Sequence, residues 1–427
     1  MNADIVVTVS NGPVLADELR RAVRAITLSE DVGMACEVTV ELDVWDANSG
    51  EYNLGAVEAL YHGHEFELWD LDAGECLGLF VVDTRETEYG QEGPSLTVSA
   101  YDGLRQFMLG TEARVYYAVT NDYEWLRALA EEYGMKIDSD PKFFATFAGD
   151  RVKELGKTDL ELIKQAAVSN GLGLPTVVYD PATRTETLRM RPLAALEQGF
   201  TPRRLRCTPD GSGETDLQTF KTRWDKGEIP VAVEVIGWDK TERKPFRVVV
   251  EATQSGPREV VREYRDIPKA DRKQVAPGKG KKGSSRGVVV HLLGDKLEAV
   301  DTGIWLTVKT KKGPKRIRSR RQYREILHTT FAEGIDAAVD YATRWIQTRI
   351  EGYYVCEGEL VPNAKELGRF RVSQAHFVTG TLADDEGWYI LTSVTHHWSS
   401  ESHTVEFNGQ RLLEEVAGSG VSTSGPR

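Results

Sequence analysis

The sequence contains two histidine pairs of a kind that can bind metal ions. His62 and His64 are separated by one glycine, so in a strand they would project to the same side, as two ligands of one ion must. His396 and His397 are adjacent. Neither pair has an evident third and fourth ligand, and an exposed strand edge is the favoured interpretation. The sequence therefore predicts no metal site.

Carboxylates are the second group of candidates. Asp and Glu are frequent over residues 30–92, but a glycosidase needs one of its two carboxyl groups removed from water so that its pKa rises. Nothing in the sequence indicates such a group. The sequence indicates no G-x-S-x-G elbow at a strand-to-helix turn, and the motifs G-x-x-x-x-G-K-S/T and H-E-x-x-H do not occur. We therefore predict a protein that is not an enzyme and has no catalytic residues, no cofactor-binding residues and no cofactor.

Basic residues gather in residues 279–286 and 309–324. The first stretch looks superficially like a phosphate loop, but its glycines have the wrong spacing and no strand-to-helix context. Both stretches could attract nucleic acid electrostatically, although only Trp305, between them, and Tyr323, within the second, could stack on bases. A solvated or partner-facing surface is favoured, and nucleic-acid binding stays open as an alternative.

The formal net charge of −13 is spread unevenly over the 427 residues. Residues 1–100 carry roughly −16 and residues 255–330 roughly +12, an asymmetry that indicates assembly surfaces or a polyanion contact. Four cysteines lie far apart, which favours reduced, buried side chains over disulfides or zinc. No apolar run is long enough to span a membrane. The N-terminus predicts no signal peptide, and we expect a cytoplasmic site of synthesis.

The same helix pattern occurs twice, over residues 121–134 and 158–171. Each copy begins with a capping side chain, Asn121 or Thr158, and has a glutamate three residues later. Each has paired apolar residues one turn apart and ends at a glycine suited to the left-handed conformation. After the second copy, residues 174–179 and 185–191 form a predicted hairpin. The two copies indicate a repeated unit within residues 103–200.

Alternating apolar residues predict strands on both sides of this unit. Residues 1–102 predict strands at 32–45, 66–71, 77–84 and 95–101, after a short helix at 15–25. Residues 201–416 predict strands at 231–238, 247–253, 287–293, 303–310, 353–360, 369–372 and 387–407. They also predict an exposed basic loop at 255–286 and a long helix at 330–349, capped by Thr330 and Glu333. We expect residues 417–427 to be a disordered tail.

The order of these features resembles the late control protein family, the baseplate hub proteins of contractile phage tails. The resemblance rests on the strand end AYDGL at residues 100–104, the two helices ending in Gly134 and Gly171, the hairpin, a helix before the last strands, and the strand WYILTSVTHH at 388–397. Such proteins are similar to the hub part of type VI secretion spikes. The basic loop at 255–286 has no counterpart in the resemblance.

The resemblance implies an α+β fold in which two tube-like β-barrel domains, residues 1–102 and 201–416, flank a small α/β insert. It implies a homotrimeric ring that adapts a sixfold tail tube to a threefold spike, located in the baseplate of a virion tail assembled in the host bacterial cytoplasm. The partners implied are a tail tube protein, a separate spike protein and other baseplate proteins, with DNA only in passage and no membrane insertion. A tail-associated peptidoglycan hydrolase is the alternative.

Overall fold

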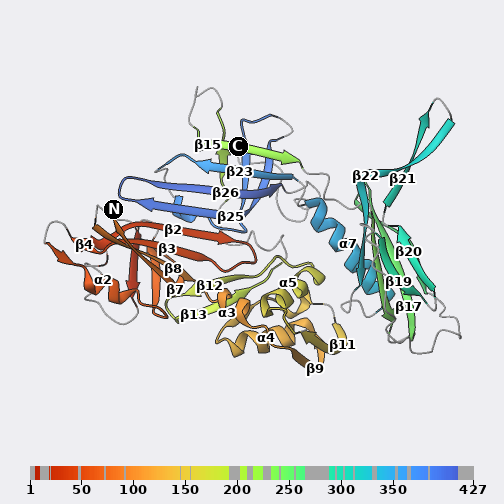
Figure 1. Ribbon diagram of the computed structural model, residues 1–427, viewed down its shortest axis with the longest axis horizontal. Helices are drawn as coiled ribbons and strands as arrows, with labels where there is room; N and C mark the ends of the chain where they lie inside the picture. Colours follow the sequence, from red (N-terminus) through yellow and green to blue (C-terminus); the bar gives the residue numbers. More distant parts are fainter. Residues whose placement is uncertain are drawn as a thin grey trace. The chain divides into compact units, whose positions relative to one another are not determined.

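The computed structural model (Figure 1) describes most of the chain. The described residues are 5–9, 19, 21–46, 50–71, 74–90, 93–144, 146–153, 155–191, 202–208, 215–224, 232–239, 242–253, 256–264, 288–293, 296–301, 303–310, 313–328, 334–351, 354–362, 367–382 and 385–411. They divide between two compact units, Met1–Arg223 with Tyr354–Arg427, and Trp224–Tyr353. Within them no helix is long and apolar enough to cross a membrane.

A 12-stranded sheet is the main element of the first unit. Its strands follow the order β1 (Ile5–Val9), β6 (Glu65–Asp70), β7 (Glu75–Gly90), β8 (Gly93–Tyr101), β3 (Glu37–Asp43), β2 (Val23–Asp31), β25 (Gly387–Ser399), β26 (His403–Arg411), β23 (Tyr354–Leu360) and β15 (Leu217–Trp224). β24 (Ala375–Thr379) adds to β25 and pairs with β14 (Arg204–Arg206). Strands from both ends of the sequence therefore share one sheet.

The junction between the two halves of this sheet is the antiparallel pair of β2 and β25, where Ile26 lies opposite Trp398. The α+β class is as predicted, and the structure is mostly antiparallel β. Two separate closed barrels are not present among the described residues, because the strands that would close them continue into each other across β2 and β25. Alternation in each strand is local information, whereas the pairing partner depends on the tertiary structure.

The core under the first half of the sheet consists of alternate strand residues and the short helix α2 (Leu54–Ala59). Ile26, Val40, Val98 and Phe66 are fully buried in it, and Ala56 is the contact from the helix. The predicted helix at 15–25 is wrong at its end, since Val23–Asp31 is strand β2. The β-branched residues of that segment favour a strand once a neighbouring strand is available.

The insert contains both predicted helices. They are α4 (Asp122–Glu132) and α5 (Asp159–Ser169), which follow β9 (Arg114–Asn121) and β11 (Thr146–Lys153), and a third helix is α3 (Leu104–Leu109). β9 and β11 pair antiparallel. The predicted hairpin is β12 (Thr176–Asp180) with β13 (Thr185–Arg189), and β10 (Lys136–Asp138) joins β13 in parallel.

The helix ends follow the sequence prediction closely. Thr158 and Glu161 form a complete capping box, and Gly134 and Gly171 have φ of 72° and 67°. The first copy differs in one bond, because the Glu124 carboxylate accepts from the amide of Thr120 rather than from that of the capping residue Asn121. The predicted apolar pairs of both helices are buried.

The second unit is a five-stranded sheet with one helix across it. Its strand order is β18 (Gly256–Tyr264), β17 (Lys244–Thr253), β16 (Ala232–Asp239), β22 (Gly313–His328) and β21 (Gly303–Thr310), and β19 (Val288–Leu293) pairs with β20 (Lys296–Asp301). Helix α7 (Ile335–Glu351) buries Ala338, Ala342 and Ile346 on this sheet, as its apolar stripe predicts.

Three predictions for the second half of the chain need correction. Helix α7 begins at Ile335, and the predicted cap residues Thr330 and Glu333 lie outside the described residues. The first part of the predicted loop is strand β18, and residues 265–286 lie outside the description. The predicted strand at 369–372 is wrong, because the segment turns through the short helix η4 (Leu367–Arg369). Residues 417–427 lie outside the described part as well.

Candidate functional site

One face of the large sheet is polar over seven consecutive strands. Residues on alternate positions face the core, and their cross-strand partners share that side. The opposite face is formed by Thr84, Glu86 and Glu88 of β7, Ser95, Thr97 and Ser99 of β8, Glu37, Thr39, Glu41 and Asp43 of β3, Ala25, Thr27, Ser29 and Asp31 of β2, Ser393, Thr395, His397 and Ser399 of β25, Thr404, Glu406 and Asn408 of β26, and Glu357 and Glu359 of β23.

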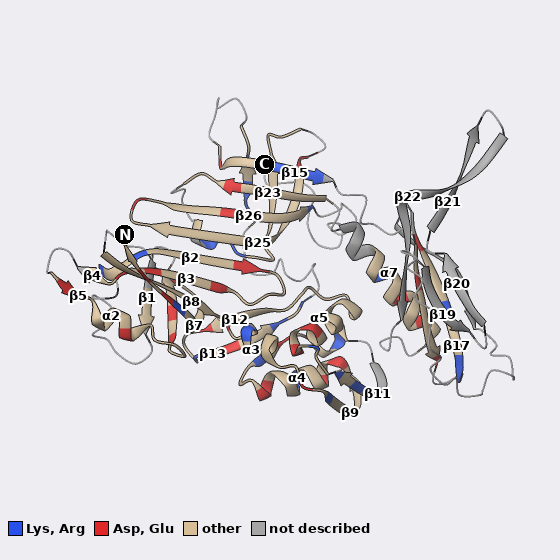
Figure 2. Cartoon of the chain, viewed as in Figure 1, with Lys and Arg blue, Asp and Glu red and all other residues tan. Residues whose placement is uncertain are grey.

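We call this set the polar face, and every ionised side chain in it is acidic. Figure 2 shows the acidic positions recurring across β2, β3, β23 and β26. The bonds on the face are local: the Tyr101 hydroxyl donates to Glu37 at 2.9 Å, and Thr27 Oγ1 lies 2.9 Å from His397 Nδ1. Because acidic residues alternate with buried apolar ones, the face combines a stable sheet with a negative potential.

Strand β15, the last strand of the large sheet after β23, carries the basic residues Lys221 and Arg223. The Phe220 ring packs edge-on against buried Tyr389, and the Thr222 hydroxyl donates to Asp385, which also accepts from Tyr354. These contacts place Phe220 and Thr222 on the core side. Over residues 220–223, alternation then puts Lys221 and Arg223, both exposed, on the same side as the polar face, whereas Leu217 at the start of the strand is buried.

A cavity of about 330 Å³ is the second candidate site. It is lined by parts of β7, β12 and β13 and by residues 371–374. Four carboxyl groups line it, those of Glu30, Glu75, Asp102 and Glu186. Burial, together with the charge of Glu186, raises the pKa of Asp102 well above its usual range, and burial raises the pKa of Glu186. No pattern in the sequence indicates these desolvated carboxyl groups, because they meet only through the contact between the strand end and the hairpin.

Both carboxyl groups also have structural partners. Asp102 Oδ1 accepts from the amide of Leu104 at 3.1 Å, and Glu186 Oε1 accepts from the amide of Gly103 at 3.0 Å. A Cβ on Gly103 would lie 2.0 Å from Met135 Cε and 2.5 Å from Glu186 Oε2. The motif Tyr101-Asp102-Gly103 thus joins the first β region to the insert.

Arg371 also lines the cavity and is held in place by two hydrogen bonds. Its Nε donates to Glu30 at 2.6 Å, and its Nη2 donates to the carbonyl of Leu77 at 3.0 Å. Glu30 is a buried residue of β2, so this bond connects residues 341 positions apart in the chain. Such a paired, hydrogen-bonded charge is costly to break and holds the two β regions in one arrangement.

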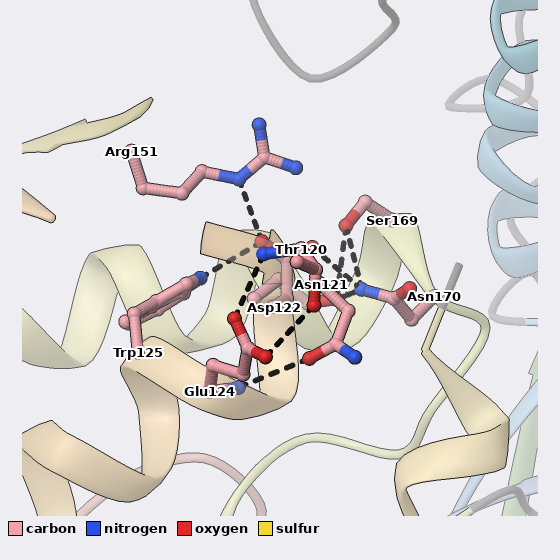
Figure 3. Close-up of polar contacts among 9 residues, drawn as sticks. Thr120, Asn121, Asp122, Glu124, Trp125, Arg151, Ser169 and Asn170 are labelled. Atoms are coloured by element: carbon pink, nitrogen blue, oxygen red, sulfur yellow. Dashed lines mark hydrogen bonds and ion pairs between the residues drawn. The ribbon is translucent and has the colours of Figure 1, made fainter. Parts of the chain in front are cut away.

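Each copy of the repeated helix begins with an aspartate in a polar network, and Figure 3 shows the network around Asp122. Asp122, the first residue of α4, accepts from the Arg151 side chain of β11 and from Asn170, the residue that ends α5. Asp159, the first residue of α5, is paired with Lys153 of β11 and accepts from the hydroxyl of Tyr133, which ends α4. The two helices therefore lie antiparallel, each start bonded to the other's end.

The histidine pairs occupy structural positions. His62 Nδ1 lies 2.8 Å from the carbonyl oxygen of Asp83, and His64 Nδ1 lies 3.2 Å from that of Ala59. His396 is fully buried, stacks on Trp398 and contacts His403, whereas His397 faces outward. Among the described residues, no group of three or more His, Cys, Asp or Glu has the geometry of a metal site. Lys279, Lys281 and Lys282 lie outside that part of the chain.

Solved structures of phage tail proteins share this fold. Compared by sequence alone, the chain matches no protein-family model and no curated protein. Its structure is similar to that of the tail protein from Neisseria meningitidis MC58, at 10% identity, with a TM-score of 0.59 and 96% of each chain covered. It is also similar to the 43 kDa tail protein of prophage MuSo2 from Shewanella oneidensis, at 11% identity and a TM-score of 0.56, over 96% of this chain and 98% of that one.

These likenesses extend over nearly the whole chain, including both β regions and the insert. They confirm, at the level of fold, the resemblance to the phage late control and baseplate hub proteins that residues 100–104 and the repeated helices indicate. The chain has the fold of the phage tail proteins.

Proposed function

We propose that this protein is the structural hub of the baseplate of a contractile phage tail or a related injection system. In this proposal three copies close into a ring, with the polar face lining its lumen. The ring joins a sixfold tail tube to a threefold spike, both of them separate proteins.

The observation that carries the proposal is the division of the sheet into two similar halves. The first half presents β7, β8, β3 and β2, and the second presents β25, β26, β23 and β15. Three chains with two four-stranded halves each would display six similar units to a sixfold tube, while keeping threefold symmetry for a spike.

The charge of the polar face supports its place in the lumen. DNA carries about one negative charge per 1.7 Å of its length and binds strongly to basic surfaces. A wall whose charged residues are Glu and Asp repels DNA, so that DNA passes without adsorbing. An outward-facing acidic surface is the competing arrangement, which a map of the assembled ring would distinguish.

The mass of the protein in solution tests the proposal. Light scattering on the purified chain should give three times 47.6 kDa, and electron microscopy should show closed rings with a central channel. A protein that remains a monomer at all accessible concentrations contradicts the proposal.

A peptidoglycan hydrolase is the second candidate, favoured by the cavity that contains Asp102 and Glu186. The raised pKa of Asp102 suits a general acid. Zymography on bacterial cell walls tests it: clearing that disappears with Glu186→Gln and Asp102→Asn, while the fold is retained, would establish the enzyme. No clearing by the native protein leaves these carboxyl groups with their structural role.

A further inference from the structure

The large sheet ends in two strand edges that have opposite charge. At one end, β7 continues beyond its partner β6: the pairing with β6 stops at Val81, and Asp83 accepts from His62. From Thr84 to Gly90 the described residues pair this strand with β8 alone. At the other end, β15 pairs with β23 alone in that part of the chain. An unpaired strand edge exposes backbone donors and acceptors that a further strand can satisfy.

The side chains of the two edges are complementary. Glu86 and Glu88 lie on the polar face at the β7 edge, and Lys221 and Arg223 lie on the same face at the β15 edge. All four are exposed, and none has an ion-pair partner among the described residues. Both edge segments are long enough to pair, since residues 84–90 and 217–224 each form one uninterrupted run of strand.

The strand directions allow the two edges to meet. The strands from β7 to β23 alternate in direction. β15 runs opposite to β23 (Figure 1), because the amide of Val361, just after β23, donates to the carbonyl of Asp216, just before β15. With eight alternating strands, β15 of one copy and β7 of the next are antiparallel when the sheet is continued around a ring.

We propose that residues 86–90 of one chain pair antiparallel with residues 219–223 of a second copy, and that this strand pair is the contact that closes the ring. It rests on the proposed hub function and names its interface. The register that satisfies both charges places Glu88 opposite Lys221 and Glu86 opposite Arg223. The same register places Tyr89, which is 82% exposed, opposite Phe220 on the core side. Cross-strand pairs of opposite charge and of aromatic rings both favour such pairing.

The pairing has a consequence for the polar face. Lys221 and Arg223 are the cations at its margin, and the strand pair would neutralise them with Glu86 and Glu88. The continued face would then contain unpaired acidic residues throughout, as a lumen for DNA requires. A monomer exposes the basic edge, so that DNA binding by monomers should exceed DNA binding by rings.

Disulfide cross-linking tests the contact directly in the full chain. With the four native cysteines replaced by serine or alanine, Glu88→Cys together with Lys221→Cys should give, under mild oxidation, a ladder ending at a covalent trimer. The matched control, Glu41→Cys with Lys221→Cys, places the first cysteine in the central strand β3 and should stay uncross-linked. A ladder that stops at a dimer, or equal cross-linking of the control, overturns the inference.

Charge reversal provides the second arm. Glu86→Lys with Glu88→Lys should raise the concentration needed for half-maximal trimer formation by about tenfold or more, because like charges then face each other. Adding Lys221→Glu and Arg223→Glu should restore assembly. Glu41→Lys with Asp43→Lys, the same charge change in β3, should leave assembly unchanged.

The outcomes separate the interface from the function. A native protein that trimerises, with a reversed variant that trimerises equally well, contradicts the strand pairing and leaves the hub proposal standing. A native chain that never assembles contradicts both. Cross-linking to another protein in place of a second copy would also overturn the inference.

Discussion

The pair of Lys153 and Asp159 shows why the insert is rigid at the scale of single residues. Nζ of the lysine lies 2.6 Å from Oδ1 of the aspartate, and both side chains are fully buried. Lys153 also donates to the carbonyl of Gly110 at 3.2 Å. Removing one partner of a buried ion pair leaves the other charge uncompensated, which is strongly destabilising.

We predict that Lys153→Met destabilises the protein by about 3 kcal/mol, because Asp159 then loses its nearest cation inside the insert. Urea unfolding followed by circular dichroism measures the change. The control is Glu131→Gln, which removes the exposed pair with Arg127, 3.6 Å apart, and should change stability by less than about 0.5 kcal/mol. Equal effects of the two variants would contradict the importance of burial.

Two buried histidines predict the acid sensitivity of the sheet. His396 Nε2 donates to the carbonyl of Phe370 at 2.7 Å, so its Nδ1 accepts from His403. Burial lowers the pKa of His396 to about 4, and burial with the nearby His396 lowers that of His403 to about 3. Both rings are therefore neutral in the folded protein, and the unfolded chain binds protons first as the pH falls.

The stability contributed by these neutral rings is complete above pH 6.5, the ordinary pKa, and is lost as the pH falls toward 4. We expect the free energy of unfolding to fall by several kcal/mol over this range through His396 and His403. His403→Phe keeps the stacking on Trp398 and should flatten the pH dependence, whereas the surface variant His62→Gln should retain it. Urea midpoints at several pH values provide the comparison, and parallel curves for all three proteins would refute the prediction.

At the scale of elements, the repeated helices offer a matched experiment. Asn121 accepts from the amide of Glu124, and Thr158 accepts from the amide of Glu161, each at 3.1 Å. Thr158→Ala and Asn121→Ala should each cost about 1 kcal/mol, because each leaves one amide at a helix start without its acceptor. Thr158→Ser keeps the acceptor and serves as the control. A loss below about 0.2 kcal/mol in both alanine variants would show that the caps are replaceable by water.

The helices and hairpin of the insert were predictable because each depends on neighbours in the sequence. Caps, apolar spacing and terminal glycines lie within a single helix. Helix α7 was predicted too early by several residues, since its true start lies at Ile335. The segment at 369–372 was predicted as a strand and is not one. Its Arg371 side chain donates instead to Glu30, a residue far away in the sequence. The pattern of residues within one segment does not indicate a bonding partner so far away in the sequence.

At the scale of the whole molecule, the second unit is inserted between two adjacent strands. Trp224 ends β15 and Tyr354 begins β23, and these strands are antiparallel neighbours in the sheet. The unit Trp224–Tyr353 has its own core under α7. The chain therefore leaves the large sheet and returns to it at nearly the same point.

We predict that residues 225–352 can be replaced by a short Asn-Gly turn without loss of the first unit. The turn suits an antiparallel hairpin, and the core formed with Ile26 and Val40 does not include the excised residues. The excised protein should unfold cooperatively and keep its β-type circular dichroism. A control that removes residues 103–200 should not fold, because it deletes the amide of Leu104 that Asp102 accepts from, together with the whole insert. An aggregated or unfolded excision variant would show that the second unit is needed for the first.

The sequence by itself determined the helices of the insert, the alternation of the strands, the acidic character of residues 1–100 and the order of features shared with phage tail proteins. Each of these depends on spacing within one segment. Only the tertiary structure decided that the two β regions form one sheet, that Asp102 and Glu186 meet in a cavity, and that Glu86 and Lys221 lie at opposite edges of one polar face. Strand pairing is set by contacts between residues hundreds of positions apart, and a strand's own pattern fits many partners equally well.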